Sequence, residues 1–305
     1  MFDVIVVGGG PAGMTAALYA LRNGKNVLVI ERTGFGGQIT HSPQVENYPG
    51  FRSISGNEIA EKMLEQILAQ GAEIEFENVT SIEDAGEKKL VHTEEGSTFE
   101  CGAVILATGV EHRMLGLPGE QELIGEGISY CAVCDGDFYT GKKVCVAGGG
   151  NSALQEAILL AEKCSEVIML QDLPNYTGEE MLQDVLFSHS NVAGLTNIKI
   201  NALLRDEYGL SGVLVESRET GEQMQISCDG LFIAIGLLPE NEPFASLAEL
   251  NEAGYFNSDE KCLTKTPGIF VAGDCRCKEI RQMTTALGDG AVAGLAACRY
   301  LDGLL

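Results

Sequence analysis

The chain has 305 residues, of which 45% are hydrophobic, and its formal net charge at pH 7 is −24. That length and apolar content are enough to bury more than one core, and the usual domain size predicts two structural units. So strong a negative charge argues against nucleic acid or an anionic membrane as a partner, and most acidic groups are expected on a solvated surface.

The first residues enter a strand pattern without a charged and then apolar leader, and no apolar run approaches the length that spans a bilayer. We therefore expect a cytoplasmic protein. The sequence has 10 cysteines. All except Cys131 and Cys134 are scattered, mostly within apolar patterns, where a thiol packs as a small hydrophobic group. The four histidines are far apart and show no ligand spacing, so we assign no metal.

The N-terminal part predicts a strand, a glycine turn and a helix. An apolar run over 2–7 enters the turn at 8–13, and apolar residues then follow at helical spacing. The next expected strand, 27–30, ends at Glu31, which suits a ribose hydroxyl. Three glycines of the turn allow close approach of a pyrophosphate, which the helix N-terminus attracts. These glycines are Gly8, Gly10 and Gly13.

The stretch from Cys131 to Cys134 predicts a redox centre. Two cysteines three positions apart on a helical turn have Cβ atoms ~5–6 Å apart, so a disulfide needs little adjustment. Asp135 follows directly and can give a proton to a leaving thiolate or take one from an attacking thiol. A zinc site completed by Cys275 and Cys277, or a purely structural disulfide, is the alternative that the spacing favours less.

A second strand, glycine turn and helix follow the cysteine pair. The expected strands are 144–147 and 167–170, and each of the two units has a later apolar strand that ends in glycine, over 103–109 and 231–236. The second turn has small residues in the places of the first. They are Gly148, Gly150 and Ala153. The repeat predicts an α/β fold of two Rossmann-like, three-layer ββα domains, the second inserted into the first.

A last expected strand, 269–272, ends in Gly273 and Asp274, an acid that suits a flavin ribityl or phosphate group. At this point the sequence, from Asp3 to Leu301, resembles the low-molecular-weight thioredoxin reductases. The motifs that carry the resemblance are Gly8–Gly13, Gly36-Gly37-Gln38, Val45–Gly50, Cys131–Gly136, Gly273-Asp274 and Arg281-Gln282. The resemblance implies a thioredoxin-disulfide reductase.

The same resemblance implies an FAD-binding domain formed by 1–112 and 243–305. It implies a second, NAD(P)H-like domain, 113–242, that carries the cysteine pair. It further implies a homodimer, thioredoxin or a thioredoxin-like protein as the partner, and a domain rotation that exposes the dithiol in turn to the flavin and to the partner.

Carried over by position, the resemblance makes Cys134 the flavin-proximal thiol, Cys131 the thiol that exchanges with the thioredoxin disulfide, and Asp135 the acid/base. The implied FAD-binding residues are Gly8, Gly10, Gly13, Glu31, Gly37, Gln38, Asn47, Thr108, Gly109, Asp274, Arg281 and Gln282. A turn role for Asn47, and cap roles for Asp274 and Gln282, are the structural alternatives.

One segment departs from the family pattern. NADPH-dependent members have a His-Arg-Arg cluster after the second unit's strand to hold the 2′-phosphate, whereas this chain has Gln171-Asp172-Leu173-Pro174-Asn175. Because a carboxylate repels that phosphate and the guanidinium groups are missing, we do not expect NADPH to be the donor. The small residues of the second turn argue only modestly for a nucleotide, since any packed strand-to-helix turn needs them.

Reduced ferredoxin is the donor that we expect, ahead of NADH, for which Gln171 or Asp172 would meet the ribose hydroxyl. Ferredoxins are usually acidic, so docking needs a local basic patch within the ~8 Å screening length, such as Lys142, Lys143 or Lys163. An NADH- or NADPH-dependent thioredoxin reductase and a dithiol oxidase that uses oxygen are the enzymatic alternatives. A non-catalytic flavin redox sensor is the alternative of another class, and sustained reduction of a disulfide protein separates it from an enzyme.

Overall fold

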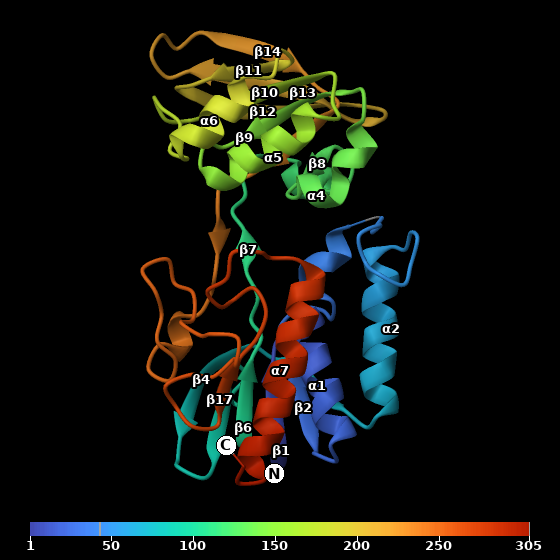
Figure 1. Ribbon diagram of the computed structural model, residues 1–305, viewed down its shortest axis with the longest axis vertical. Coiled ribbons are helices and arrows are strands. Elements are labelled where there is room, and N and C mark those ends of the chain that lie inside the picture. Colours follow the sequence, from blue (N-terminus) through green and yellow to red (C-terminus); the bar gives the residue numbers. More distant parts are fainter. Residues whose placement is uncertain (43, 305) are drawn as a thin grey trace. The chain divides into compact units, whose positions relative to one another are not determined.

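The computed structural model describes residues 1–42 and 44–304. The chain divides into an outer unit, Met1–Glu111 with Leu238–Leu305, and an inserted unit, His112–Leu237 (Figure 1). The boundaries expected from the sequence, after 112 and after 242, lie slightly further along the chain than these. The two crossing segments, β7 (Glu111–His112) and β16 (Leu237–Leu238), pair as a two-stranded sheet.

The outer unit is built on a seven-stranded sheet. Its strand order is β3-β2-β1-β6-β5-β4, and β17 also pairs with β6. The strands are β1 (Phe2–Val7), β2 (Val27–Ile30), β3 (Glu73–Glu75), β4 (Val79–Asp84), β5 (Lys89–Thr93), β6 (Thr98–Leu106) and β17 (Ile269–Val271). β1 lies between two parallel neighbours, so its apolar run is buried on both faces. β6 begins earlier than the sequence predicts because its first half pairs with β5 as a hairpin.

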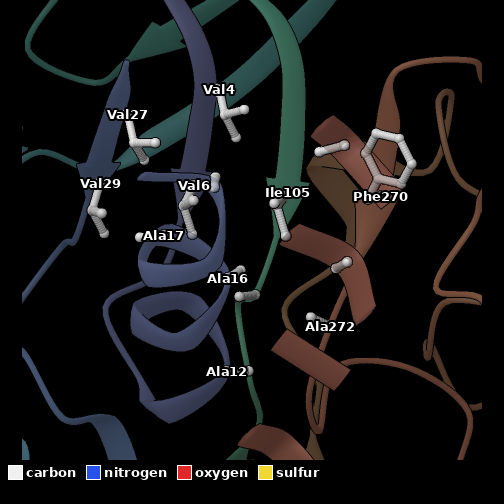
Figure 2. Close-up of a cluster of buried hydrophobic side chains, with 14 of the residues drawn as sticks. Val4, Val6, Ala12, Ala16, Ala17, Val27, Val29, Ile105, Phe270 and Ala272 are labelled. Atoms are coloured by element: carbon white, nitrogen blue, oxygen red, sulfur yellow. The ribbon is translucent and has the colours of Figure 1, made fainter. Parts of the chain in front are cut away.

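Helices cover one face of this sheet. They are α1 (Pro11–Arg22), α2 (Gly56–Ala69) and α7 (Met283–Leu301), with the short helices η1 (Gly37–His41) and η3 (Glu242–Phe244) elsewhere in the unit. α1 and α7 pack closely because Gly290 and Gly294 leave room for the backbone oxygens of Ala12 and Ala16. The cluster between the sheet and these helices is shown in Figure 2. Its labelled members are Val4, Val6, Ala12, Ala16, Ala17, Val27, Val29, Ile105, Phe270 and Ala272.

Asp289 of α7 anchors a buried group of charges in the outer unit. Its carboxylate accepts hydrogen bonds from Arg276 Nε at 2.8 Å, from Arg276 Nη2 at 2.7 Å and from Lys278 Nζ at 2.9 Å. The backbone N–H of Gly273 donates to it at 3.0 Å. The side chains of Arg276 and Lys278 are 6% and 8% exposed. The group therefore fixes α7 to the segment that follows β17.

Asp289→Asn is expected to lower the free energy of unfolding by about 3 kcal/mol, because two buried cations lose their counter-charge. Burial alone would raise the pKa of Asp289, but the bonds from Arg276 and Lys278 outweigh it and leave the pKa below its usual value. A depressed carboxyl pKa adds stability above the unfolded pKa, and this stability is lost as pH falls through the folded pKa. Thermal unfolding measured across the acidic range should therefore show that the variant loses less stability than the wild type as pH falls. Equal losses in the two proteins would contradict the prediction.

The inserted unit has three layers. A parallel sheet in the order β11-β10-β9-β15-β8 lies between a layer of helices and an antiparallel sheet β12-β13-β14. The strands are β8 (Ile128–Ser129), β9 (Lys143–Ala147), β10 (Glu166–Leu170), β11 (Val192–Leu195), β12 (Ile198–Asp206), β13 (Gly209–Ser217), β14 (Gln223–Ser227) and β15 (Gly230–Ile233). The helices are α3 (Glu120–Leu123), α4 (Ala132–Asp135), η2 (Gly136–Tyr139), α5 (Asn151–Ala161) and α6 (Glu180–Phe187).

The two units confirm the expected α/β class and the insertion of one Rossmann-like unit into another. Seven of the eight cysteines outside the pair are buried thiols, as their apolar sequence contexts predict, and Cys277 is half-buried. Over residues 1–42 and 44–304, no helix is both long and apolar enough to cross a membrane.

Candidate functional site

The cysteine pair lies at the start of α4, immediately after β8. Cys131 is the N-cap residue of α4, and it forms a disulfide with Cys134, with the two Cα atoms 5.3 Å apart. The hydroxyl of Ser129, at the end of β8, accepts a hydrogen bond from the N–H of Cys131 at 3.1 Å. The strand end and the helix turn therefore hold both sulfur atoms in place, and the predicted pair is a disulfide in the structure.

Asp135 ends α4, next to the disulfide. Its Oδ2 accepts a 2.6 Å hydrogen bond from the hydroxyl of Ser129, while its Oδ1 is buried without a hydrogen-bond partner among the described residues. Burial raises the pKa of Asp135, and the bond from Ser129 opposes that rise only in part. A carboxyl group with a raised pKa can hold a proton closer to neutral pH, which is what proton exchange with a nearby thiolate requires.

The first glycine turn, between β1 and α1, has room for backbone only at two of its glycines, Gly8 and Gly13. Gly8 has φ +106°, a conformation that favours glycine, and a Cβ there would overlap the carbonyl oxygen of Ala107. A Cβ at Gly13 would overlap the carbonyl oxygen of Gly8. A Cβ at Gly10 would meet nothing within 4 Å, so the space in front of Gly10 is open at the N-terminus of α1. This is the arrangement that a pyrophosphate needs.

Glu31, at the end of β2, is tied to the same turn. Its Oε2 accepts a 2.6 Å hydrogen bond from the N–H of Gly9, and its Oε1 accepts bonds from the N–H groups of Thr33 at 2.9 Å and Gly34 at 3.3 Å. The carboxylate thus joins the second strand to the glycine turn. Its expected contact with a ribose hydroxyl stays a prediction.

Several other residues expected to bind FAD are brought together in the outer unit, although they are far apart in sequence. Asn47 Nδ2 donates to Gln282 Oε1 at 3.3 Å. Gln282 also caps α7 through a capping box, so it fills the cap role that was expected as the alternative to FAD binding. Arg281 lies over the ring of Tyr255 at 4.3 Å, and its Nε donates to the carbonyl oxygen of Asp274 at 3.4 Å.

In the outer unit, Asp274 has a buried carboxyl oxygen that lacks a hydrogen bond among the described residues. It follows Gly273 directly after β17, and its Oδ1 is buried without a hydrogen-bond partner among the described residues. Burial raises its pKa, and Lys278 and Arg281 oppose that rise. A buried carboxyl oxygen without a partner costs free energy unless a bound group satisfies it.

The remaining expected residues lie around the same glycine turn. Gly37, with φ +57°, lies against Gly10, and Gln38 follows it in η1 as an exposed side chain. Gly109 has φ +67° and follows Thr108, whose hydroxyl donates to Asn241 Oδ1 at 2.9 Å. Sequence reasoning missed Asn241. It is fully buried, and no motif in the sequence marks it.

The second glycine turn, between β9 and α5, has the same backbone as the first. Gly148 has φ +131°, and a Cβ there would overlap the carbonyl oxygen of Ala234. Gln171 stands as far beyond Gly148 as Glu31 stands beyond Gly8, and its side chain also lies against the middle glycine of its turn. The polar contacts of the two side chains, however, differ.

The carboxamide of Gln171 is engaged by its own loop. Its Nε2 donates to the carbonyl oxygen of Asn175 at 3.0 Å, and its Oε1 accepts from the N–H of Asp172 at 3.1 Å. Asp172 in turn pairs with Arg218, which directly follows β13. Both side chains that the sequence offers to a ribose hydroxyl therefore already have partners.

A chain segment also contacts the second glycine turn and the N-terminus of α5. The N–H groups of Thr177 and Gly178 donate to the carbonyl oxygen of Gly149 at 2.8 and 2.9 Å. The N–H of Glu179 donates to Asn151 Oδ1 at 2.7 Å, and Asn151 Nδ2 donates to Glu179 Oε1 at 3.0 Å. The segment Thr177–Glu179, which we call the cover segment, thus places a carboxylate at the N-terminus of α5. The first turn has a similar backbone contact, since the N–H of Gly36 donates to the carbonyl oxygen of Gly9 at 2.9 Å, so the Glu179 carboxylate is what distinguishes the second turn.

Comparison with known proteins agrees with this geometry. A model of the pyridine nucleotide-disulphide oxidoreductase family matches residues 2–290. The chain belongs to this family. It is 41% identical over 304 residues to a thioredoxin reductase of Listeria innocua, covering 100% of this chain and 95% of the relative. It is 39% identical over 302 residues to a Clostridium pasteurianum protein described as a 34.2 kDa protein in the rubredoxin operon, covering 99% and 97%.

The solved thioredoxin reductase of Streptococcus pyogenes has the same fold. Its structure superimposes with a TM-score of 0.94 at 39% identity, and the match covers 99% of each chain. The chain is therefore a flavin-dependent disulfide oxidoreductase of the thioredoxin reductase type, and FAD is its cofactor.

The outer unit fits FAD on its own geometry. The open space at Gly10, the N-terminus of α1 and the buried Oδ1 of Asp274, which has an ion pair with Lys278 at 4.0 Å but no hydrogen bond among the described residues, are features that a bound dinucleotide would fill. Bound there, FAD would be held by residues of the first glycine turn and by Asp274. The second turn differs from the first in the Glu179 carboxylate, which Asn151 holds at the N-terminus of α5.

Proposed function

We propose that the chain reduces the disulfide of thioredoxin or a thioredoxin-like protein, and that its electrons come from a ferredoxin-class protein rather than from NADPH. The dithiol centre and the family support the first half. The observation that carries the second half is the Glu179 carboxylate at the N-terminus of α5 in the inserted unit.

FAD, when bound, supplies the two electrons that open the Cys131–Cys134 disulfide. The reduced Cys131 then attacks one sulfur of the thioredoxin disulfide, the bond between the thioredoxin sulfurs breaks, and a mixed disulfide forms. Cys134 attacks Cys131 in that mixed disulfide, which restores the internal disulfide and releases thioredoxin as a dithiol. Asp135 holds the proton that moves between the sulfur atoms, because its carboxyl group is buried beside them.

The charges in the second turn explain why NADPH is disfavoured. The 2′-phosphate would meet the Asp172 carboxylate, and the Arg218 guanidinium beside it already pairs with that carboxylate. The pyrophosphate would meet the Glu179 carboxylate at the helix N-terminus. Like charges this close repel, so two separate parts of NADPH are opposed. NADH avoids the first conflict but not the second.

The Clostridium pasteurianum relative, described by its rubredoxin operon, supports a protein electron carrier as the donor. The lysines that the sequence suggests for docking give less support than expected. Lys163 pairs with Asp137, and Lys143 pairs with Glu166 at 3.1 Å. Two of the three cations are thus already compensated, and the docking surface is not set by them alone.

Anaerobic titration of the FAD-loaded protein tests the donor. Stoichiometric NADPH, NADH and reduced ferredoxin are added separately while the flavin absorbance is followed, and only reduced ferredoxin is expected to bleach it rapidly. Rapid bleaching by NADPH would overturn the proposal, and bleaching by NADH alone would make this an NADH-linked reductase. Sustained reduction of a thioredoxin disulfide distinguishes an enzyme from a sensor that exchanges once, and oxygen consumption with dithiols would indicate an oxidase.

We also propose a homodimer and a cytoplasmic location. A hollow of about 340 Å³ between α1, α2 and α7 is lined largely by apolar side chains, and Tyr19 and Val292 are exposed on the same helices, which suits a second copy of the chain. Light scattering of the FAD-loaded protein measures its oligomeric state. The eight free thiols of the described chain are typical of a reducing compartment.

A further inference from the structure

One buried hydroxyl group, that of Ser129, joins the two ends of the dithiol segment. Ser129 is the last residue of β8 and is 4% exposed. Its Oγ accepts a hydrogen bond from the N–H of Cys131 at 3.1 Å and donates to Oδ2 of Asp135 at 2.6 Å. The first bond is an ordinary turn contact of a serine with the residue two positions on. The second bond goes beyond the turn, because it ends on the acid/base.

The carbonyl group of Cys131 sets the direction of these bonds. A serine hydroxyl has one hydrogen, which can go to Oδ2 of Asp135 or to the carbonyl oxygen of Cys131, 3.5 Å away. That carbonyl oxygen already accepts from the N–H groups of Cys134 at 3.2 Å and of Asp135 at 3.0 Å, so both of its lone pairs are used. The hydroxyl hydrogen therefore points to Asp135. Oδ2 has to accept it whether the carboxyl group is ionised or protonated.

The other carboxyl oxygen of Asp135, Oδ1, is buried and accepts no hydrogen bond from the described residues. A proton can therefore bind to it without displacing a donor. We propose that Ser129 is a positioning residue that holds Oδ2 of Asp135 as an acceptor, so that the protons exchanged with the cysteine pair enter and leave through Oδ1. This role rests on the proposed disulfide exchange, which it deepens by naming the atom through which Asp135 acts.

The protons and electrons of the exchange balance at this one oxygen. When Cys131 attacks a partner disulfide, its thiol proton goes to Oδ1, a bond from Cys131 to one partner sulfur forms, and the partner's S–S bond breaks. Oδ1 then gives the proton to the departing partner thiolate. Attack of Cys134 on the Cys131 sulfur repeats the transfer with the second proton and the second partner sulfur. The partner is reduced, the internal disulfide re-forms, and Asp135 is ionised before and after each step.

Titratable groups on the elements that pack against α4 also respond to the charge of Asp135. On α5, burial and then the Asp135 charge raise the pKa of Glu156 to about 8. On η2, burial and then the Asp135 charge raise the pKa of Tyr139 to about 12, so it stays protonated, and Asp137 is exposed. Burial raises the pKa of Asp135 itself, and the bond from Ser129 opposes the rise. Loss of the Ser129 hydroxyl should therefore raise that pKa further.

Infrared difference spectroscopy on the oxidised, FAD-loaded protein tests the assignment without thioredoxin or an electron donor. The protonated-carboxyl band of Asp135 is the one that Asp135→Asn removes, which separates it from the band of Glu156. With the proton on Oδ1, the carbonyl oxygen is Oδ2, so the wild-type band should lie at the wavenumber of a hydrogen-bonded carbonyl. Ser129→Ala should move the band to higher wavenumber because that bond is lost. Ser129→Thr keeps the hydroxyl and should leave the band in place.

The same spectra recorded across pH give the titration midpoint of the band. Ser129→Ala should raise the midpoint by about one pH unit, because an ionised carboxylate loses a charge-assisted hydrogen bond. Ser188→Ala removes a serine hydroxyl bond just after α6, at an exposed position, and should change neither the band nor the midpoint. A band that Ser129→Ala leaves in place would overturn the proposal. So would a wild-type band at the wavenumber of an unbonded carbonyl, a result that does not depend on whether Ser129→Ala folds.

A kinetic measurement follows the same carboxyl group during exchange. The FAD-loaded protein is reduced with dithiothreitol, mixed with hydroxyethyl disulfide and quenched by alkylation, and mass spectrometry of the peptide with both cysteines gives the fraction of re-formed disulfide. The rate should fall as pH drops through the pKa of Asp135. In Ser129→Ala the fall should begin about one pH unit higher, and in Ser129→Thr it should match the wild type. An unchanged profile in Ser129→Ala would contradict the role. If the protein exchanges with hydroxyethyl disulfide but does not reduce thioredoxin, the proposed function fails while the role of Ser129 stands.

Discussion

Cys134→Ser is expected to lower the steady-state rate of thioredoxin reduction by about 10³-fold or more, because the internal disulfide can no longer form and the resolving sulfur is lost. The variant should still fold and bind FAD. Serine has nearly the same volume as cysteine, and the disulfide closes so short a loop that it adds little to stability. The measurement is thioredoxin turnover with a chemically reduced donor, together with the flavin content of the purified protein.

The two cysteines should behave differently when a thioredoxin with a single cysteine is offered as its mixed disulfide with a small thiol, which leaves when the thiol of this protein attacks the thioredoxin sulfur. Cys134→Ser keeps the Cys131 sulfur, so it should accumulate a stable mixed disulfide, whereas Cys131→Ser should not. Cys277→Ser is the matched control, since Cys277 is a half-buried thiol outside the pair. Equal trapping by both variants of the pair would contradict the assignment of Cys131 as the attacking thiol.

The scaffold of the site could be predicted from the sequence because its constraints are local. A glycine turn after a buried strand has few backbone solutions, and Gly8 and Gly148 both adopt the positive φ and the close backbone contact that the pattern requires. The cysteine pair was predictable for the same reason: three positions on one helical turn bring the sulfur atoms together whatever surrounds them.

The contacts that decide specificity were not predictable, because residues distant in sequence make them. Asn47 meets Gln282 across more than two-thirds of the chain, and Arg218 reaches Asp172 from the turn after β13. The sequence shows that Gln171–Asn175 lacks the family's basic cluster. It does not show that the Gln171 carboxamide bonds to its own loop, or that the Glu179 carboxylate lies at the N-terminus of α5.

Gly13→Ala is expected to give protein with at least about 100-fold weaker FAD binding, because the new Cβ would overlap the carbonyl oxygen of Gly8. Both atoms belong to the turn, so neither a side-chain rotation nor a distant shift relieves the overlap. Overpacking usually costs about 1–3 kcal/mol, and a clash with backbone lies at or above the upper end; about 1.4 kcal/mol is a factor of ten in affinity. Flavin content after purification, and FAD titration of the apoprotein, measure the effect.

Substitutions at two further glycines distinguish damage to the turn itself from steric blocking of the bound ligand. A Cβ at Gly10 meets nothing within 4 Å, and at Gly150 it meets only the Thr177 hydroxyl at 3.7 Å, and neither position has positive φ. Gly10→Ala should therefore leave the apoprotein's stability unchanged within about 0.5 kcal/mol but weaken FAD binding, since the methyl group enters the pyrophosphate space. Gly150→Ala makes the same change in the second turn, where no nucleotide is expected, and should alter neither FAD binding nor turnover. A loss of turnover in Gly150→Ala with FAD still bound would instead place a nucleotide under the cover segment.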